Sequence, residues 1–267
     1  MQDAFKERVL AGKTAFVAGA SSGINLGIAQ HFARAGAKIA LISRNHEKII
    51  AAARTITDEG FEAIGMAADV RDFNSVDTAM KQAHDRLGKF DIVISGAAGN
   101  FVAPALGMSS NGFKTVVDID LIGTFNVLRA SFQYLNRPGA SLISITAPQA
   151  VNPSLFQAHV CAAKAGINML TKCFAMEWGP AGVRVNAISP GPIADTEGMA
   201  RLAPSAEAEK LIKSRIALRD YGTKTDIADT ALFLSTDNAK YITGTIVDCD
   251  GGSKLGDAGA DALGDFK

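Results

Sequence analysis

A glycine-rich segment near the N-terminus has the residue types that bind the phosphates of a dinucleotide. The segment GASSGINLG, Gly19–Gly27, directly follows a short apolar run and leads into a stretch with helical periodicity. Glycines let the backbone approach a pyrophosphate, whose charge then lies at the helix N-terminus. A tight turn without a ligand is the alternative, but the position after a first strand favours nucleotide binding. Asn25 stands where a third glycine is expected, and its side chain narrows the approach. The expected cofactor contacts are Gly19, Ser21, Ser22, Gly23, Asn25 and Leu26.

The end of the next apolar run, LISRN at 41–45, indicates which nucleotide is bound. An NAD site usually has an acidic residue here for the ribose 2′-hydroxyl, whereas this chain has Ser43 and Arg44. Because a guanidinium pairs bidentately with phosphate oxygens, the pattern predicts NADPH, unless Arg44 is a solvated surface charge. Asp69 and Val70, after the third run, are expected beside the adenine, with helix capping as the alternative for Asp69.

Lys164 is the strongest candidate for a reacting group. It lies in CAAKAGINML, residues 161–170, a small and apolar stretch in which a solvated lysine is out of place. We therefore expect Lys164 to contact the cofactor. Val160 stands four residues earlier, where one familiar oxidoreductase pattern has its catalytic tyrosine. We interpret Cys161 as a small core residue rather than a nucleophile.

The elements that must position these groups are those of a parallel sheet. Short apolar runs alternate with amphipathic stretches of helix length, which is the pattern of βαβ units. The expected strands are Thr14–Val17, Lys38–Ile42, Ala63–Met66, Asp91–Ile94, Ser141–Ile145, Arg184–Ile188 and Ile246–Cys249. Glycines that suit left-handed helix ends precede several of them, namely Gly36, Gly60, Gly88, Gly139 and Gly182. The expected fold class is α/β: a single domain over residues 1–267 with a doubly wound parallel sheet of about seven strands and helices on both faces.

Composition argues against several kinds of partner. The 27 basic and 27 acidic side chains are scattered along 267 residues, so neither nucleic acid nor an anionic membrane surface is expected. No run approaches the roughly 18 apolar residues of a membrane span. The 3 cysteines form no Cys-x-x-Cys pair, which predicts free thiols in a cytoplasmic protein, and no metal site is expected. The small, acidic tail at 254–267 is expected to be flexible or to lie over a neighbouring subunit.

Several of these motifs together resemble the short-chain dehydrogenase/reductase superfamily across nearly the whole chain. They are the GASSGINLG turn, SGAAG at 95–99, the Lys164 helix, SPGPI at 189–193 and VDCDGG at 247–252. The resemblance implies a Rossmann fold and a homo-oligomer, either a tetramer or a dimer. It extends the expected cofactor contacts to Ala97, Ala98, Lys164, Pro190, Gly191 and Ile193.

Three stretches resemble the 2,4-dienoyl-CoA reductases in particular, and most closely the peroxisomal-type branch that lacks the active-site tyrosine. They are AAGNF at 97–101, VVDIDLIGTFNV at 116–127 and EWGPAGVRVNAISPGPIADTEGM at 177–199. His159, five residues before Lys164, matches a histidine that is common in that branch. The resemblance implies an acyl-CoA thioester as substrate and a role in fatty acid metabolism.

The resemblance also shows which catalytic groups are missing. By position, the superfamily's asparagine, serine, tyrosine and lysine correspond to Asp120, Ala147, Val160 and Lys164. Valine cannot protonate the alkoxide that forms when a ketone is reduced. Reduction of a conjugated thioester instead places charge on the thioester oxygen and needs a proton on carbon. A water held between a carboxylate and an ammonium group can supply that proton, so Asp120 and Lys164 are the expected catalytic pair.

Other roles remain open for these residues. Asp120 has a structural or helix-capping role as its alternative, and Asp118 is a rival for any functional aspartate. His159 is expected either to bind substrate or to pack at a helix start. Thr146 is a weak candidate for the missing hydroxyl, because its side chain should point to the other side of its strand.

Substrate contacts are expected where doubly wound sheets bind ligands, at the carboxyl ends of the strands. Asn100 and Phe101 follow the fourth strand there, although core packing is the alternative for Phe101. Residues 194–219 are expected to form a lid over an acyl chain. Basic side chains in that segment either meet the phosphates of coenzyme A or, as the better-supported option, are solvated. They are Arg201, Lys210, Lys213, Arg215 and Arg219.

Three functions follow from these residues. The leading interpretation is an NADPH-dependent oxidoreductase that reduces a 2,4-dienoyl-CoA or related enoyl-CoA by hydride transfer and water-mediated protonation. The second is a dehydrogenase acting on a ketone or alcohol, with His159 or Asp120 in place of the tyrosine. The third is a catalytically silent NADPH-binding sensor or structural protein, which the loss of both hydroxyls favours.

Overall fold

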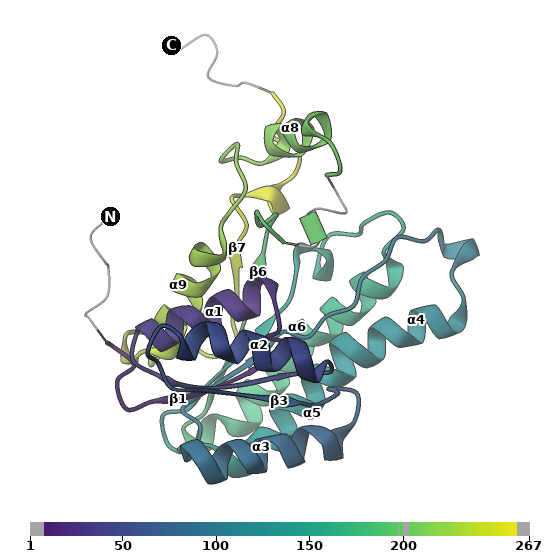
Figure 1. Ribbon diagram of the computed structural model, residues 1–267. Helices are drawn as coiled ribbons and strands as arrows, with labels where there is room; N and C mark the ends of the chain where they lie inside the picture. The colour runs from purple at the N-terminus through teal and green to yellow at the C-terminus, as the bar shows by residue number, and fades with distance from the viewer. Residues whose placement is uncertain (1–7, 197, 200–202, 261–267) are drawn as a thin grey trace.

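Seven parallel strands form the centre of the computed structural model, which describes residues 8–196, 198–199 and 203–260 (Figure 1). Their order across the sheet is β3-β2-β1-β4-β5-β6-β7, and each neighbouring pair is parallel. The strands are β1 (Thr14–Ala18), β2 (Lys38–Ser43), β3 (Ala63–Ala67), β4 (Ile92–Ser95), β5 (Ser141–Ile145), β6 (Arg184–Pro190) and β7 (Ile246–Cys249). Each expected strand is present with its ends shifted by at most a few residues, and the predicted fold class is confirmed.

Helices cover both faces of the sheet (Figure 1). One face carries α1 (Gly23–Arg34), α2 (His46–Thr57) and α9 (Lys224–Ser235), and the other carries α3 (Phe73–Leu87), α5 (Gly123–Ser131) and α6 (Ala158–Trp178). The remaining helices with bounds are α4 (Ser110–Val117) and α8 (Ala206–Arg215). Short 3₁₀ turns complete the chain: η1 (Ala105–Gly107), η3 (Phe132–Tyr134), η4 (Pro148–Ala150), η5 (Gly179–Ala181), η6 (Asp237–Ala239) and η7 (Ser253–Leu255).

The strands are continuous apolar runs because both faces of the sheet are covered. Every residue of β1 is buried, and two separate apolar cores fill the spaces on either side. Phe32 and Ile49 belong to one core, and Met80 and Leu128 to the other. Among the expected helix-ending glycines, Gly36 has φ 100° and the others also have positive φ, which is the conformation predicted for them. No helix within the described ranges is long and apolar enough to cross a membrane.

A π-helical turn, η2 (Asp118–Ile122), connects α4 to α5 and was not expected from the sequence. The turn places Asp120 in the interior, where its exposed fraction is 0%. The turn ends at Gly123, where a Cβ would lie 2.6 Å from Cγ2 of Val70, so a side chain has no room. Because π turns are rare and concentrate at functional sites, this one marks the region around Asp120.

The segment after β7 packs against α8 and forms a projection above the sheet (Figure 1). Arg215 Nε lies 3.3 Å from Asp257 Oδ2, and the Ala258 amide donates to the Arg215 carbonyl at 3.1 Å. Arg219 Nη2 donates to the carbonyl of Ala260 at 3.1 Å. The first half of the expected flexible tail is therefore in contact with α8, while residues 261–267 lie outside the described ranges.

Candidate active site

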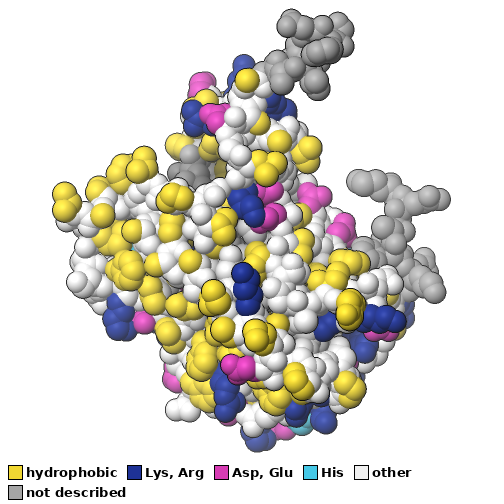
Figure 2. Space-filling model, turned by 180° about the vertical axis from the view of Figure 1, so that it is seen from behind, with side chains coloured by type: hydrophobic (Ala, Val, Ile, Leu, Met, Phe, Trp, Pro, Cys, Tyr) yellow, Lys and Arg dark blue, Asp and Glu magenta, His cyan; other side chains and the backbone are white. Residues whose placement is uncertain are grey.

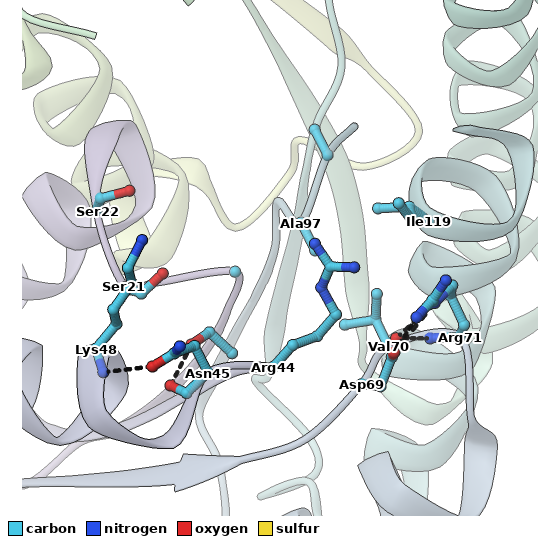
Figure 3. A pocket seen from close by; sticks show the side chains of 13 residues that line it. Ser21, Ser22, Arg44, Asn45, Lys48, Asp69, Val70, Arg71, Ala97 and Ile119 are labelled. Atoms are coloured by element: carbon cyan, nitrogen blue, oxygen red, sulfur yellow. Dashed lines mark hydrogen bonds and ion pairs between the residues drawn. The ribbon is translucent and has the colours of Figure 1, made fainter. Parts of the chain in front are cut away.

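A cavity of about 940 Å³ opens at the carboxyl ends of β1, β2 and β4 (Figure 3). The strand order reverses at β1 and β4, and doubly wound sheets bind ligands at this switch point. The expected cofactor contacts that line the cavity are Gly19, Ser21, Ser22, Ser43, Arg44, Asp69, Val70, Ala97 and Ala98. The sequence interpretation missed four other lining residues, Asn45, Lys48, Arg71 and Ile119.

The turn after β1 lines this cavity and requires a glycine at position 19. Its φ is +75°, and a Cβ there would lie 2.6 Å from the Cα of Ala97. The side chain of Asn25 braces the same turn, because Nδ2 donates to the carbonyls of Gly19 at 3.2 Å and Gly96 at 2.8 Å. Asn25 is outside the lining of the cavity, so its side chain shapes the turn from behind.

Replacing Asn25 with alanine is expected to lower the free energy of unfolding by about 2 kcal/mol, because two carbonyl oxygens lose their donor in a buried place. Urea denaturation measures this loss, and Gln30→Ala is the matched control. Gln30 lies on the same helix and donates to Thr55 Oγ1 at an exposed position, at 3.0 Å. Equal stability of the two variants would contradict the bracing role of Asn25.

Positive charge without a partner collects at the end of β2. The Asn45 side chain caps α2 by accepting from the Lys48 amide at 2.9 Å. In Figure 3 the Arg44 side chain reaches across the cavity toward Ala97, and the Lys48 side chain rises beside Ser21. Neither cationic group forms an ion pair or a hydrogen bond with the described residues. This end of the cavity therefore suits a phosphate better than a neutral hydroxyl.

The carboxylate of Asp69 is bound mainly by Arg71, although the charge of Arg44 also lowers the pKa of Asp69. Arg71 Nη2 lies 2.5 Å from Asp69 Oδ2, and Nε donates to Oδ1 at 3.0 Å. The hydrogen bonds from Arg71 lower the pKa of Asp69, against the opposing effect of burial. Asp69 therefore stays ionised, and its two oxygens hold Arg71 at the wall of the cavity (Figure 3).

Asp120 and Lys164 form a buried pair beside the cofactor cavity. Lys164, on α6, is 6% exposed, and its Nζ lies 3.1 Å from Asp120 Oδ2 and donates to the carbonyl of Ile145 at 3.1 Å. Oδ1 of Asp120 accepts from the amide of Gly99 at 2.7 Å. Oδ2 has ion-pair distance to Lys164 but no hydrogen bond with any described residue. One carboxylate oxygen is thus fixed by the loop after β4, and the other remains able to accept a hydrogen bond.

The residues around this pair bear on the alternatives left open by the sequence. Asp118 pairs with Lys114 on the surface, so the buried aspartate is Asp120. Val160 is 5% exposed and supplies no proton. Thr146 directs its hydroxyl to the backbone carbonyl of Lys164 at 3.4 Å, beneath the helix.

His159 lies at the start of α6 with an exposed fraction of 0%. Its ring centroid is 4.3 Å from that of Phe101, and the rings are inclined by 45°. Neither ring nitrogen has a hydrogen bond of normal geometry to a described residue. Burial lowers the pKa of His159, although the backbone of Phe101 and the charge of Asp120 oppose the shift. The lowered pKa favours the neutral imidazole, and its ring nitrogens are buried without a hydrogen bond of normal geometry.

A chain of amide side chains runs along the same side of the site. Gln149 Nε2 donates to Gln157 Oε1 at 3.2 Å, and Gln157 Nε2 donates to Asn100 Oδ1 at 3.2 Å. Gln157 is 6% exposed and was missed by the sequence interpretation, because its contacts exist only after two distant loops meet. Asn100 and Phe101 are thus fixed to the entrance of α6, next to His159.

The other expected cofactor contacts lie outside the lining of the 940 Å³ cavity. Gly191 lies close to the residue that follows β7, since a Cβ added at Gly191 would lie 2.6 Å from the Cα of Asp250. Ile193 is 3% exposed and forms a bridge with Gly222. The cavity lining likewise excludes Gly23, Leu26, Lys164 and Pro190.

The basic side chains of the expected lid are mostly engaged with protein groups. Lys213 Nζ lies 3.0 Å from Glu209 and 2.8 Å from Asp220, which raises the pKa of Lys213, and Arg215 pairs with Asp257. These contacts favour the solvated-surface interpretation over phosphate binding. Arg201 and parts of the lid lie outside the described residues. Within the described ranges, no group of three or more His, Cys, Asp or Glu side chains is arranged to hold a metal ion.

The sequence of this chain is similar to those of known reductases. A family model described as "Enoyl-(Acyl carrier protein) reductase" matches residues 19–254. The peroxisomal 2,4-dienoyl-CoA reductase [(3E)-enoyl-CoA-producing] of Arabidopsis thaliana is 39% identical over 262 residues, which cover 94% of this chain and 88% of the relative. The enzyme of the same name from Mus musculus is 40% identical over 92% of this chain and 85% of its own length. A probable 2,4-dienoyl-CoA reductase [(2E)-enoyl-CoA-producing] of Bacillus subtilis is 34% identical over 91% of this chain and 97% of its own.

Solved structures have the same fold over nearly the whole chain. A putative short-chain alcohol dehydrogenase from Sinorhizobium meliloti has a TM-score of 0.88 and 29% identity, with 94% of this chain and 100% of that chain covered. A gluconate 5-dehydrogenase from Burkholderia cenocepacia, in complex with NADP and tartrate, has a TM-score of 0.88 and 28% identity. The coverage is 93% of this chain and 98% of that chain.

Proposed function

The chain belongs to the short-chain dehydrogenase/reductase family and is an oxidoreductase, and from this premise we propose that it reduces 2,4-dienoyl-CoA or a closely related conjugated acyl-CoA with NADPH. The observation that carries the proposal is the buried pair of Asp120 and Lys164, at 3.1 Å, next to Val160. The site lacks the tyrosine hydroxyl that ketone reduction needs, but it has a carboxylate and an ammonium group that could hold a water and offset negative charge.

The cofactor proposal rests on the shape and charge of the cavity. NADPH, when bound, supplies the hydride. Because Gly19 has no side chain, the backbone of the turn after β1 can approach a pyrophosphate closely, and the N-terminus of α1 follows the turn. Ser43, Arg44 and Lys48 are the groups that would hold the 2′-phosphate. The related gluconate 5-dehydrogenase, which was solved with NADP, supports this class of cofactor.

The reaction follows from where negative charge develops on the substrate. When hydride adds to the far carbon of the conjugated diene, charge spreads to the thioester oxygen. The imidazole of His159, whose nitrogens form no hydrogen bond of normal geometry with the described residues, would donate a hydrogen bond to that oxygen. Asn100 and Phe101 complete the substrate side of the site. The ammonium group of Lys164 would offset the developing negative charge, because charges in a buried site are only weakly screened by water.

Protonation of the carbon next to the thioester carbonyl completes the reaction. Oδ2 of Asp120 would accept a hydrogen bond from a water, and Lys164 would fix the orientation of that water. The water would then give a proton to the carbon, and the hydroxide left behind would take a proton from the Lys164 ammonium, which regains one from solvent. The product would be a 3-enoyl-CoA, which is the product stated in the names of the Arabidopsis and mouse relatives. The Gly99 amide keeps the other oxygen of Asp120 in place.

The test is NADPH oxidation with a short 2,4-dienoyl-CoA, followed by product analysis, with a simple ketone and with NADH run in parallel. Rapid turnover of the dienoyl thioester alone, with NADPH preferred, is the expected result. Turnover of the ketone alone would assign the acid role to His159 or Asp120 and overturn the proposal. Tight NADPH binding without turnover of either substrate would favour the sensor interpretation.

Removing the two unpaired cations is expected to change cofactor preference. In Arg44→Ala with Lys48→Ala, the KM for NADPH should rise by at least about 100-fold, because hydrogen bonds to charged groups contribute about 1.5–3 kcal/mol each. The KM for NADH should stay within a factor of about two, since NADH has no 2′-phosphate. Steady-state kinetics measure both values, and Arg54→Ala, on the outer side of α2, is the control. An unchanged ratio of the two KM values would contradict the NADPH assignment.

We also propose a homo-oligomer, either a dimer or a tetramer, in a cytoplasmic compartment. The outer surfaces of α5 and α6 support the assembly, because Phe125 is 40% exposed, Met169 60% and Met176 82%. The three cysteines are free thiols, which supports a reducing compartment.

A further inference from the structure

One wall of the cofactor cavity is built from two segments that are distant in the sequence. Val70 belongs to the loop after β3 and Ile119 to the π-helical turn η2, and both line the 940 Å³ cavity. Figure 3 shows them with Arg71 on the side of the cavity away from Ser21 and Lys48. Val70 is 4% exposed and Ile119 is 8% exposed, so this wall is apolar and suits the flat face of a nucleotide base.

The first turn of α5 holds Val70 through both its main chain and its side chain. Asn126 Nδ2 donates to the carbonyl of Val70 at 2.8 Å, although 56 positions separate the two residues in the sequence. Gly123 lies on the same face of the helix as Asn126, and a Cβ added at Gly123 would lie 2.6 Å from Cγ2 of Val70. The position of Val70 is therefore tied to that of α5.

The same helix is continuous with the turn that carries Asp120, the carboxylate of the catalytic dyad with Lys164. The turn η2 ends at Ile122 and α5 begins at the next residue. Ile119 directly precedes Asp120, and its Cδ1 would lie 3.1 Å from a Cβ added at Gly99. The amide of Gly99 holds Oδ1 of Asp120 at 2.7 Å. A ligand packed on Ile119 would thus act directly beside the reactive carboxylate.

Charge links the cavity wall and the π-helical turn as well. Arg71 follows Val70 in the chain, and its hydrogen bonds to Asp69 are the main cause that raises the pKa of Arg71. The charge of Asp118, the first residue of η2, adds to that shift. Asp118 also pairs with Lys114 on α4. Both ends of the wall are therefore connected with the turn.

We propose that Asn126 is a positioning residue that couples the adenosine half of the cofactor to the catalytic turn. An adenine bound against Val70 and Ile119 would hold η2, and with it Asp120, in the geometry that protonation of the substrate needs. The adenosine half would then contribute to the rate as well as to affinity, because binding energy from a remote part of a ligand can organise the reacting groups. The inference rests on the proposed function and adds a residue that acts through Asp120.

The outer side of the same elements is apolar and exposed. Ile122 of the π-helical turn is 42% exposed, and Phe125 of α5 is 40% exposed. Figure 2 shows apolar side chains widely distributed over the face seen from behind. A neighbouring subunit that packed on Ile122 and Phe125 would also hold the turn, so the state of assembly has to be recorded in the test.

The experiment measures amide hydrogen exchange in residues 116–124 of the full-length protein, with and without saturating adenosine 2′,5′-bisphosphate or ADP. Calorimetry establishes saturation. For the wild type, each ligand is expected to slow exchange in this segment by at least about threefold. Both ligands carry the adenine but only the bisphosphate carries a 2′-phosphate, so the pair separates the apolar wall from the phosphate site.

In Asn126→Ala the protection at saturating ligand should disappear, and kcat for dienoyl-CoA at saturating NADPH should fall by about tenfold or more. Ser131→Ala is the matched control. Ser131 is buried in the same helix and donates to the carbonyl of Leu128 at 2.8 Å, within α5. This variant loses a comparable buried hydrogen bond, but it should keep the protection and kcat.

The outcomes separate the coupling from the reaction. Binding of both ligands without protection of the wild type would overturn the coupling and leave the cofactor site intact, and this comparison needs no variant. Protection that Asn126→Ala retains, or that Ser131→Ala also loses, would show that Asn126 has only a structural role. Protection lost in Asn126→Ala alone, in a wild type that does not reduce dienoyl-CoA, would support the coupling and reject the reaction.

Two further results would count against the coupling. If Asn126→Ala dissociates in sedimentation velocity while Ser131→Ala does not, a contact between subunits holds the turn and the inference is wrong. If the wild type binds neither ligand, the cofactor proposal and the coupling both fail.

Discussion

Lys164→Met is expected to reduce kcat for a 2,4-dienoyl-CoA by at least about a thousandfold, because it removes both the charge that offsets the thioester oxygen and one holder of the proposed water. The ammonium group is buried and fixed by Ile145 and Asp120, so no other described cation is placed to replace it. Single-turnover measurement of NADPH oxidation at saturating substrate isolates the chemical step from cofactor binding.

A loss of activity must be separated from a loss of folding. Breaking a buried ion pair from one side costs about 3–5 kcal/mol, because a charge remains buried without its partner. The double variant Lys164→Met, Asp120→Asn avoids that charge and should unfold at higher denaturant concentration than Lys164→Met alone, while staying inactive. Lys13→Met is the control for an ion pair far from the chemistry, since Lys13 lies 3.2 Å from Asp91 and is half exposed. Near-normal turnover in folded Lys164→Met would exclude the dyad.

Asp120→Asn is expected to lower kcat by about 100- to 1,000-fold while NADPH affinity remains within a factor of about three. The amide keeps the shape of the side chain, and its oxygen can still accept from the Gly99 amide. The NH₂ group would then face Lys164 in the position of Oδ2, so two donors would meet and the proposed water would lose its acceptor. Stopped-flow reduction and a fluorescence titration with NADPH measure the two quantities.

Asp118→Asn is the matched control for this substitution. Asp118 belongs to the same π-helical turn but pairs with Lys114 at the surface, so kcat should stay within about twofold. A pair of variants with equal activity would show that the carboxylate of Asp120 has no role in protonation, whatever its part in the fold.

Much of the architecture was predictable because it depends on local pattern. A parallel strand covered on both faces must be apolar throughout, and a helix that ends in a left-handed turn favours glycine. These two rules locate β1 to within one residue and explain the positive φ at Gly36. The π-helical turn escaped prediction, since VVDIDLIGTFNV reads equally well as one continuous helix.

Site residues were predictable where the residue type and its sequence neighbours indicate a role. They were not predictable where the role depends on contacts between distant parts of the chain. Lys164 stood out because its neighbours are small and apolar. Gln157 did not stand out, because its partner Asn100 lies 57 residues away in the sequence and no spacing rule connects them. Arg71 was missed although its partner, Asp69, is only two residues away. Asn25 was expected to face the cofactor, whereas its amide binds two backbone carbonyls behind the turn.

The π-helical turn sets the rotational phase between α4 and α5. In an ordinary helix each residue advances by about 100°, so the loss of a single residue from η2 would rotate one helix against the other by about that angle. Gly123 would leave its contact with Val70, and Asp120 and Lys164 would be out of step although both were still present. The reactivity of this chain therefore depends on helical register as well as on residue identity, and a one-residue length change in this turn would silence the site without altering any catalytic side chain.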